Sequence, residues 1–179
     1  MSGAADSHKS VNELNSDLFE AEQDDRFHNP VDARKKAMDY LARREYGRRE
    51  LEKKLATAGF DPQVAIAAVG QLQCDGLQDD RRFVDSFARS RISQGKGPAR
   101  ILLELSQRGI DGHLIEDVIA ELAVDWTALA REVRQKKFGE ADPENFREKA
   151  KQMRFLQYRG FEQSEIQAAF SEKKGVRVN

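Results

Sequence analysis

Apolar residues recur along this chain at spacings of three and four, the pattern of amphipathic helices with one buried face. One window carries apolar residues at Val64, Ala65, Ala68, Val69 and Leu72. The same pattern returns 50 positions later, at Leu114, Ile115, Val118, Ile119 and Leu122. No segment alternates polar and apolar residues with a period of two, so the pattern predicts helices and no strands.

The residues that precede these two windows match at the same offset. The matched pairs are Gly47 with Gly97, Leu51 with Ile101, Leu55 with Leu105, and Gly59-Phe60-Asp61 with Gly109-Ile110-Asp111. A third, looser copy has Gly160-Phe161-Glu162 in the place of this turn, and Leu156 lies four residues before its glycine. Self-similarity at a fixed offset indicates a tandem-repeat fold.

Turn residues mark the expected helix ends. Gly59, Gly109 and Gly160 lie where a helix C-cap requires a left-handed residue. We expect N-caps at the aspartates Asp61, Asp111, Asp125 and Asp142, and proline follows the first and the last of them. We expect nine helices, over residues 32–46, 48–58, 62–75, 79–94, 98–108, 112–123, 126–138, 143–159 and 162–172.

These patterns predict an all-α fold, an elongated array of three tandem three-helix repeats. Neighbouring repeats are expected to share cores, because a short three-helix unit buries too little apolar surface alone. The repeats are expected at residues 31–76, 77–124 and 125–179, the last with a lengthened middle helix. Residues 1–30 lie outside them.

Charge is distributed unevenly between this first segment and the rest. Residues 1–30 contain seven acids and two bases, a net charge of −5, which leaves +4 for the remainder of a chain whose net charge is −1. The segment is polar with scattered apolar positions, so we interpret it as a disordered solubilising tail. The alternative is an acidic segment that shields the basic body or docks a partner.

The residue types that catalysis or metal binding requires are scarce. The single cysteine, Cys74, excludes an internal disulfide and fits a reducing cytosol, and His113 is the one histidine outside the tail. Asp79 and Asp80 precede a helix, where capping explains them. Gly95-Lys96-Gly97 lacks the rest of a phosphate-binding loop. We therefore expect a non-enzymatic protein with no cofactor and no metal site.

Two groups of basic residues are candidate binding surfaces. The first surrounds the junction of the first two helices and consists of Arg43, Arg44, Arg48, Arg49, Lys53 and Lys54. The second is a row of Arg147, Lys151 and Arg154, beside a predicted core row of Phe146, Ala150 and Met153. Aligned cations fit the phosphates of a nucleic acid or an acidic protein groove. Most aromatic residues, Phe83, Phe87, Phe161 and Phe170 among them, fall at core positions, so we do not expect base stacking.

The order and spacing of several motifs over residues 33–172 resemble the RecX family. Residues 37–41 are similar to the family's Ala-x-x-x-Leu helix, and residues 50–55 to its Glu-Leu-x-x-Lys-Leu helix. Residues 77–83 are similar to its Leu-x-Asp-x-x-Phe connector, and Arg159-Gly160-Phe161 matches its closing Arg-Gly-Phe turn. The longer middle helix of the third copy departs from the family pattern.

The resemblance implies a regulator that binds the RecA recombinase filament on single-stranded DNA and inhibits its recombinase, ATPase and coprotease activities. It also implies three-helix repeats. One alternative is a helix-turn-helix-like DNA-binding regulator, because short consecutive helices meet around Gly59 and Gly109. Another is an enzyme that depends on a cofactor. We expect a cytoplasmic monomer without a membrane span.

Overall fold

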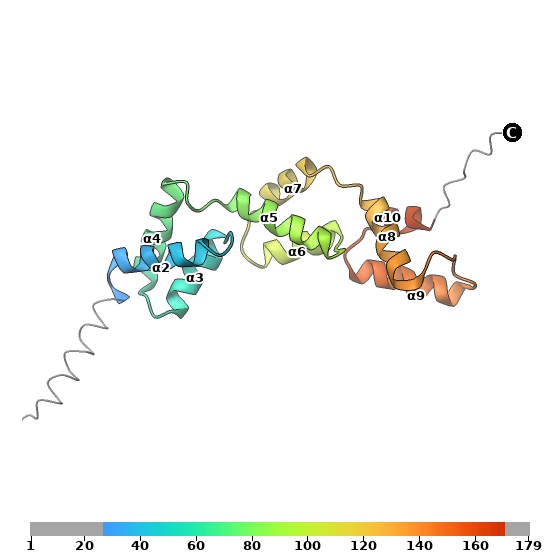
Figure 1. The fold of residues 1–179 in the computed structure, drawn as a ribbon, viewed down its shortest axis with the longest axis horizontal. Helices are drawn as coiled ribbons and strands as arrows, with labels where there is room; N and C mark the ends of the chain where they lie inside the picture. Colours follow the sequence, from blue (N-terminus) through green and yellow to red (C-terminus); the bar gives the residue numbers. More distant parts are fainter. Residues whose placement is uncertain (1–26, 171–179) are drawn as a thin grey trace, which may run out of the picture. The chain divides into compact units, whose positions relative to one another are not determined.

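The computed structural model describes residues 27–170. In this part of the chain all regular elements are helices and none is a strand (Figure 1), which confirms the predicted all-α class. The helices are α2 (Pro30–Leu41), α3 (Arg48–Thr57), α4 (Pro62–Cys74), α5 (Asp80–Ser93), α6 (Pro98–Ser106), α7 (Gly112–Glu121), α8 (Trp126–Phe138), α9 (Phe146–Tyr158) and α10 (Gln163–Ala169). They form three consecutive groups of three, as the repeat predicts.

The chain divides into two compact units, of which the first ends at Gln78 and contains α2, α3 and α4. Leu51, Leu55 and Leu72 are fully buried at the centre of its core. Phe27 packs on the same core, with its ring edge-on to that of Phe60 at a centroid distance of 5.6 Å. Of the tail expected at residues 1–30, residues 1–26 lie outside the described part, whereas residues 27–30 belong to this folded unit.

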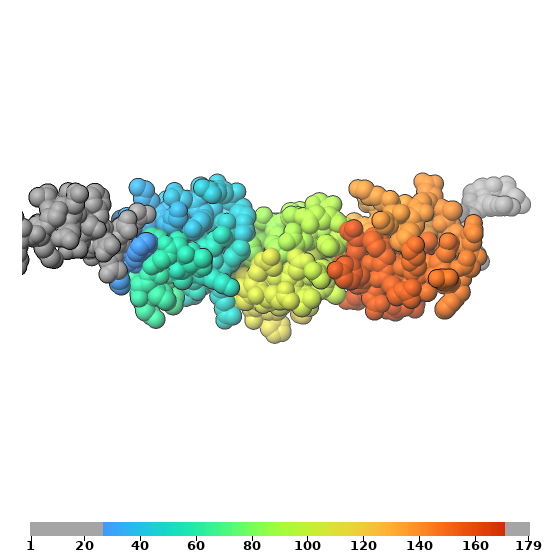
Figure 2. Space-filling model, turned by 90° about the horizontal axis from the view of Figure 1, so that it is seen from below, coloured from blue at the N-terminus to red at the C-terminus, as the bar shows by residue number. Residues whose placement is uncertain are grey.

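The second unit begins at Asp79 and contains α5 to α10. It has two clusters of buried apolar residues, one around Phe83, Ile101 and Leu105 and the other around Leu156 and Phe161. The half-buried Trp126 packs against both clusters. The orange and red residues of the last three helices form one packed body in the space-filling view (Figure 2).

The same turn closes the middle helix of each group. At the end of α3, Gly59 has φ +101°, and the backbone N–H of Phe60 donates to the carbonyl of Leu55 at 3.1 Å. This six-to-one bond is the Schellman motif, which requires a left-handed residue before its donor. The equivalent bonds join Ile110 to Leu105 at 3.3 Å and Phe161 to Leu156 at 3.2 Å.

The capping predictions are confirmed at three of four aspartates. The side chains of Asp61, Asp111 and Asp125 accept hydrogen bonds from the first turns of α4, α7 and α8. The prediction for Asp142 was wrong: α9 begins at Phe146, and Asn145 caps it. The reason is tertiary, since a buried arginine of α8 contacts the segment around Asp142 and holds it as a loop.

The first helix is shorter than the predicted 32–46, because α2 ends at Leu41. The residues that follow form a non-helical connector in which Tyr46 is only 6% exposed. The guanidinium of Arg44 lies 3.6 Å from the Tyr46 ring centroid, and Gln78 Nε2 donates to the Tyr46 carbonyl at 3.1 Å. Burial of this tyrosine, rather than a local helix breaker, therefore accounts for the helix end.

Backbone hydrogen bonds join the second and third groups inside the second unit. The Gly97 N–H donates to the Arg159 carbonyl at 2.9 Å, and the Ala99 N–H donates to the Gly160 carbonyl at 3.1 Å. Arg159 Nη1 in turn donates to the carbonyl of Gln94 at 2.7 Å. These bonds fix the start of α6 against the end of α9, so the surfaces around this joint have a defined geometry.

Candidate partner-binding surface

The sequence of α9 gives this helix one buried and one outward face. The side chain of Asn145 accepts a hydrogen bond from the Glu148 N–H at 3.0 Å and starts the helix. Leu156 is fully buried and Gln152 is 6% exposed, and Met153 packs against the same core. The burial of these three side chains determines which face of α9 points outward.

The outward face of α9 carries the predicted row of Arg147, Lys151 and Arg154. All three side chains are exposed, at spacings of four and three that align them along the helix. None of the three has a hydrogen bond, ion pair or ring contact with any residue between 27 and 170. Their charges are therefore available to a partner rather than used within the fold.

Two aromatic residues of α9 are exposed, contrary to the expectation for one of them. Phe146, predicted to lie in the core row, is 87% exposed, and Tyr158 is 77% exposed. Tyr158 follows Arg147 by about three full turns, so it extends the cationic row on the same face. Sequence reasoning missed Tyr158, although its spacing from the row could have indicated it.

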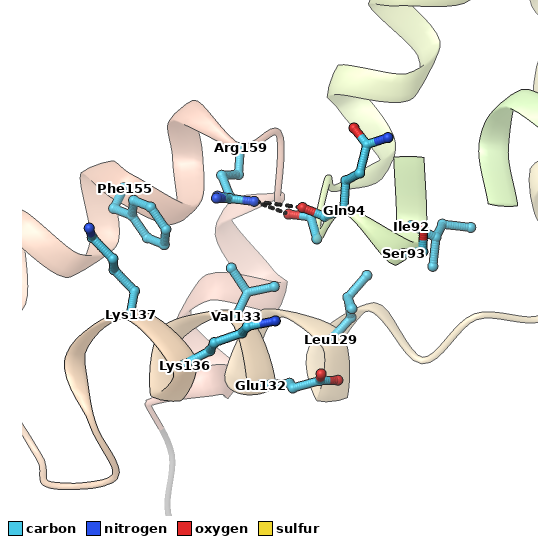
Figure 3. Close-up of a pocket in the computed structure, with 11 residues that line it drawn as sticks. Ile92, Ser93, Gln94, Leu129, Glu132, Val133, Lys136, Lys137, Phe155 and Arg159 are labelled. Atoms are coloured by element: carbon cyan, nitrogen blue, oxygen red, sulfur yellow. Dashed lines mark hydrogen bonds between the residues drawn. The ribbon is translucent and has the colours of Figure 1, made fainter. Parts of the chain in front are cut away.

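A hollow of about 450 Å³ lies between the end of α5, α8 and α9 (Figure 3). Its lining includes Leu129, Glu132, Val133, Lys136, Lys137 and Phe155. Phe155 follows Lys151 by four residues, so the hollow borders the cationic row. Both lysines lie in the last turn of α8, and Glu132 of the same helix is the one acidic residue that lines the hollow. The edge of the hollow is therefore positively charged.

A buried arginine positions the loop between α8 and α9. Arg134 is 3% exposed, and its Nη1 lies 3.4 Å from Gln152 Oε1, 3.5 Å from the Ala141 carbonyl and 3.9 Å from the Asp142 carboxylate. Its guanidinium lies 5.1 Å from the Phe170 ring centroid. No motif in the sequence marks Arg134, and its register on the buried face of α8 was the only signal available for it.

In the basic cluster of the first unit, some cations pair with acids of the same unit and others have no ionic partner in the described structure. Arg44 pairs with Glu50 at 2.7 Å and Arg48 pairs with Glu52 at 2.9 Å, so both stabilise the fold. Lys54 Nζ lies 5.1 Å from the Tyr40 ring centroid. The exposed residues without an ionic partner in the described structure are Arg43, Arg49 and Lys53.

In the described part of the chain, side chains that could form a metal site or a catalytic site are few. Residues 27–170 contain no group of three or more His, Cys, Asp or Glu side chains that could hold a metal ion. Cys74 is exposed, and the side chain of His113 is 94% exposed. None of the helices described is long and apolar enough to span a bilayer.

Comparison with known proteins gives a consistent result for each of the three helix groups. The models of the first, second and third three-helix domains of RecX match residues 33–72, 79–119 and 124–170, respectively. The regulatory protein RecX of Halorhodospira halophila is 45% identical over 133 residues, which cover 74% of this chain and 83% of the relative. The protein of the same name from Pseudomonas entomophila is 46% identical over 132 residues, 74% and 85% of the two chains.

Solved structures agree on the fold. The crystal structure of RecX from Lactobacillus salivarius superposes with a TM-score of 0.66 at 22% identity, over 78% of this chain and 93% of that one. A second crystal structure of a regulatory protein RecX gives a TM-score of 0.64 at 24% identity, over 77% and 71% of the two chains. Three matched domains in order, together with relatives above 40% identity, show that the chain belongs to the RecX family of regulatory proteins.

Proposed function

We propose that this protein binds the RecA filament on single-stranded DNA and lowers its ATPase, strand-exchange and coprotease activities without catalysing a reaction itself. The relatives are named as regulatory proteins. The observation that carries the proposal is the row of Arg147, Lys151 and Arg154, three exposed cations without partners in the described structure.

The dimensions of this row suit a nucleoprotein filament. Arg154 follows Arg147 by seven positions, which is about 10 Å of helix at 1.5 Å per residue. A DNA strand presents about three phosphates over that length at the ~3.4 Å spacing of the B form. Tyr158 lies one turn beyond the row and is available to stack on an unpaired base or to pack on a protein side chain.

The bordering hollow adds a second kind of contact to the same face. Lys136 and Lys137 supply charge at its edge, and Leu129, Val133 and Phe155 supply an apolar wall. A mixed surface of this kind can receive an acidic and apolar part of a protein beside the nucleic acid. Among the described surfaces, α9 and the hollow together are therefore our candidate for filament contact.

The test measures RecA's DNA-dependent ATPase and strand exchange with increasing amounts of this protein. We expect both activities to fall, and the effect to weaken as salt rises, because screened charges contribute less. Co-sedimentation with filaments and with bare single-stranded DNA is compared in parallel. Unchanged RecA activities at saturating protein would contradict the proposal. A parallel co-sedimentation with bare duplex DNA tests the helix-turn-helix alternative, which binding to duplex DNA as tight as or tighter than binding to filaments would favour.

A further inference from the structure

A second hollow, of about 380 Å³, lies within the second unit where α6, α7 and the start of α10 meet. Its floor is apolar and is made by Leu102, Ile119, Val124 and Trp126. Each of these four side chains is only half-buried, so the floor remains open to solvent. This α6–α7–α10 hollow is distinct from the one that borders the cationic row.

The charge around the α6–α7–α10 hollow is negative. Glu116 of α7 and Glu162 at the start of α10 line it, and no lysine or arginine does. His113 lies beside Glu116, with Nδ1 4.0 Å from its carboxylate and a side chain that is 94% exposed. Burial raises the pKa of Glu165, the hydrogen bond from the Glu162 backbone N–H lowers it, and the nearby Glu162 charge raises it, so that the net shift is upward.

We propose that the α6–α7–α10 hollow is a docking site for a short segment that combines apolar side chains with cations, and that residues 171–179 of this chain occupy it. This segment contains Lys173, Lys174 and Arg177 against the single acid Glu172, with Val176 and Val178 between and after the bases. Its composition is thus the complement of an apolar floor with an acidic edge.

The segment is long enough to reach the hollow. It follows Phe170, the C-cap of α10, and the eight steps from Glu162 to Phe170 cover about 12 Å at 1.5 Å per residue. Nine residues in extended form span about 30 Å. The chain can therefore run back along α10, with Lys173 and Lys174 near the carboxylates and the valines on the apolar floor. Attachment to α10 gives an effective concentration on the order of 1 mM, so even weak contacts keep the site partly occupied.

Trp126 provides the readout, because it is the only tryptophan of the chain and lines the hollow. The full chain is compared with a chain that ends at Phe170, using quenching of tryptophan fluorescence by the neutral molecule acrylamide. With about half occupancy at millimolar effective concentration, removal of the segment should raise the quenching constant about 1.5- to 2-fold. A synthetic peptide of residues 171–179 should reverse the increase, and far-UV circular dichroism should show unchanged helicity.

Charge variants of the full chain test the same contact without truncation. Lys173→Glu with Lys174→Glu, or Glu116→Lys alone, should each raise quenching to the value of the truncated chain. Combining all three substitutions should restore protection, because the ion pairs are re-formed with reversed sign. Asp117→Lys is the matched control: it changes the same charge on the neighbouring residue of α7, which does not line the hollow, and should have no effect.

Two results would overturn the proposal. Equal quenching in the full chain, the truncated chain and the double-lysine variant would show that the segment does not cover Trp126. Protection that increases with protein concentration would show that a second copy covers the hollow, instead of the chain's own residues 171–179.

Discussion

Leu55 and Leu105 are equivalent residues of the first and second groups, each four positions before a left-handed glycine, and both are fully buried. Each also supplies the carbonyl that receives the bond from the residue after that glycine. Packing and turn closure therefore depend on the same position. Because a protein interior is close-packed, shortening either side chain leaves a cavity that the surroundings fill only partly.

We predict that Leu55→Ala and Leu105→Ala each lower the free energy of unfolding by about 2–5 kcal/mol. Leu103→Ala serves as the control, because Leu103 is 49% exposed and its truncation should cost less than about 1 kcal/mol. Urea unfolding followed by circular dichroism measures all three. Losses below about 1 kcal/mol at both buried leucines would contradict the repeat equivalence.

Glu104 is the centre of an ionic group in the second unit. Its two carboxylate oxygens receive hydrogen bonds from Arg91 Nε at 2.7 Å and Arg100 Nε at 2.8 Å. Burial by itself raises the pKa of Glu104, but the hydrogen bonds and charges of the two arginines outweigh burial, and the pKa is lowered from its ordinary value of 4.5. The folded state therefore favours the ionised form of this carboxyl.

We predict that Glu104→Gln lowers the free energy of unfolding by about 1.5–3 kcal/mol at neutral pH. A carboxyl whose pKa is depressed by folding stabilises the fold above its ordinary pKa, and this contribution is lost as the pH falls through the folded value. The difference between wild type and variant should therefore shrink as the pH falls below 4.5. Asp85→Asn is the control, because its pair with Arg89 is exposed and solvent screening should leave it little effect on stability. A difference that stays constant from neutral pH to pH 3 would contradict this account.

At the scale of elements, the joint between the second and third groups depends on a close approach of two backbone segments. A Cβ atom on Gly97 would lie 2.3 Å from the carbonyl oxygen of Gly160, which is too close for any side chain. The Gly97 N–H also takes part in the joint through its bond to the Arg159 carbonyl. Glycine at this position is therefore required by packing and not by its φ of −82°.

We predict that Gly97→Ala destabilises the second unit by about 1–3 kcal/mol, because the backbone of the joint has to move apart. Gly112→Ala is the matched control, since Gly112 begins α7 and has open space where its Cβ would lie. Its effect should stay within about 1 kcal/mol of zero. Thermal unfolding compares the two variants, and equal stability of both would show that the joint is not closely packed.

Helices and caps were predictable from the sequence wherever the signal is local. Asp61 and Asp111 each precede a regular apolar pattern, and their side chains accept hydrogen bonds from the first turn of the helix that follows. The helix expected from residue 143 starts later, because Arg134 and its buried surroundings hold Asp142 in a loop. The end of α2 was likewise unpredictable from local residues, since it depends on the burial of Tyr46.

At the scale of the whole molecule, charge is distributed unevenly among surfaces with different chemistry. α9 carries four bases and one acid, whereas α7 carries three acids and no base. The first suits a polyanion such as single-stranded DNA, and the second suits a basic segment. The net charge of −1 hides this division, because positive and negative surfaces cancel in the sum.

The sequence predicted the cationic row of the candidate surface but not its surroundings. Arg147, Lys151 and Arg154 could be identified because the spacing of one helix aligns them. Tyr158 was missed because an aromatic residue at helical spacing is usually buried, and only the packed structure shows that it is 77% exposed. The bordering hollow combines residues from α5, α8 and α9, so it required the tertiary fold.

The most direct test of the central claim, that α9 carries filament contact, is co-sedimentation of two charge-reversed variants with RecA filaments on single-stranded DNA. One variant carries Arg147→Glu, Lys151→Glu and Arg154→Glu, and the other carries Arg43→Glu, Arg49→Glu and Lys53→Glu. Each reverses three exposed cations that have no ionic partner in the described structure. We predict that the first variant binds about 10- to 100-fold more weakly with unchanged helicity, and that the second binds nearly as wild type. Wild-type affinity of the α9 variant, together with loss of binding by the first-unit variant, would contradict the assignment and place the contact on the first unit.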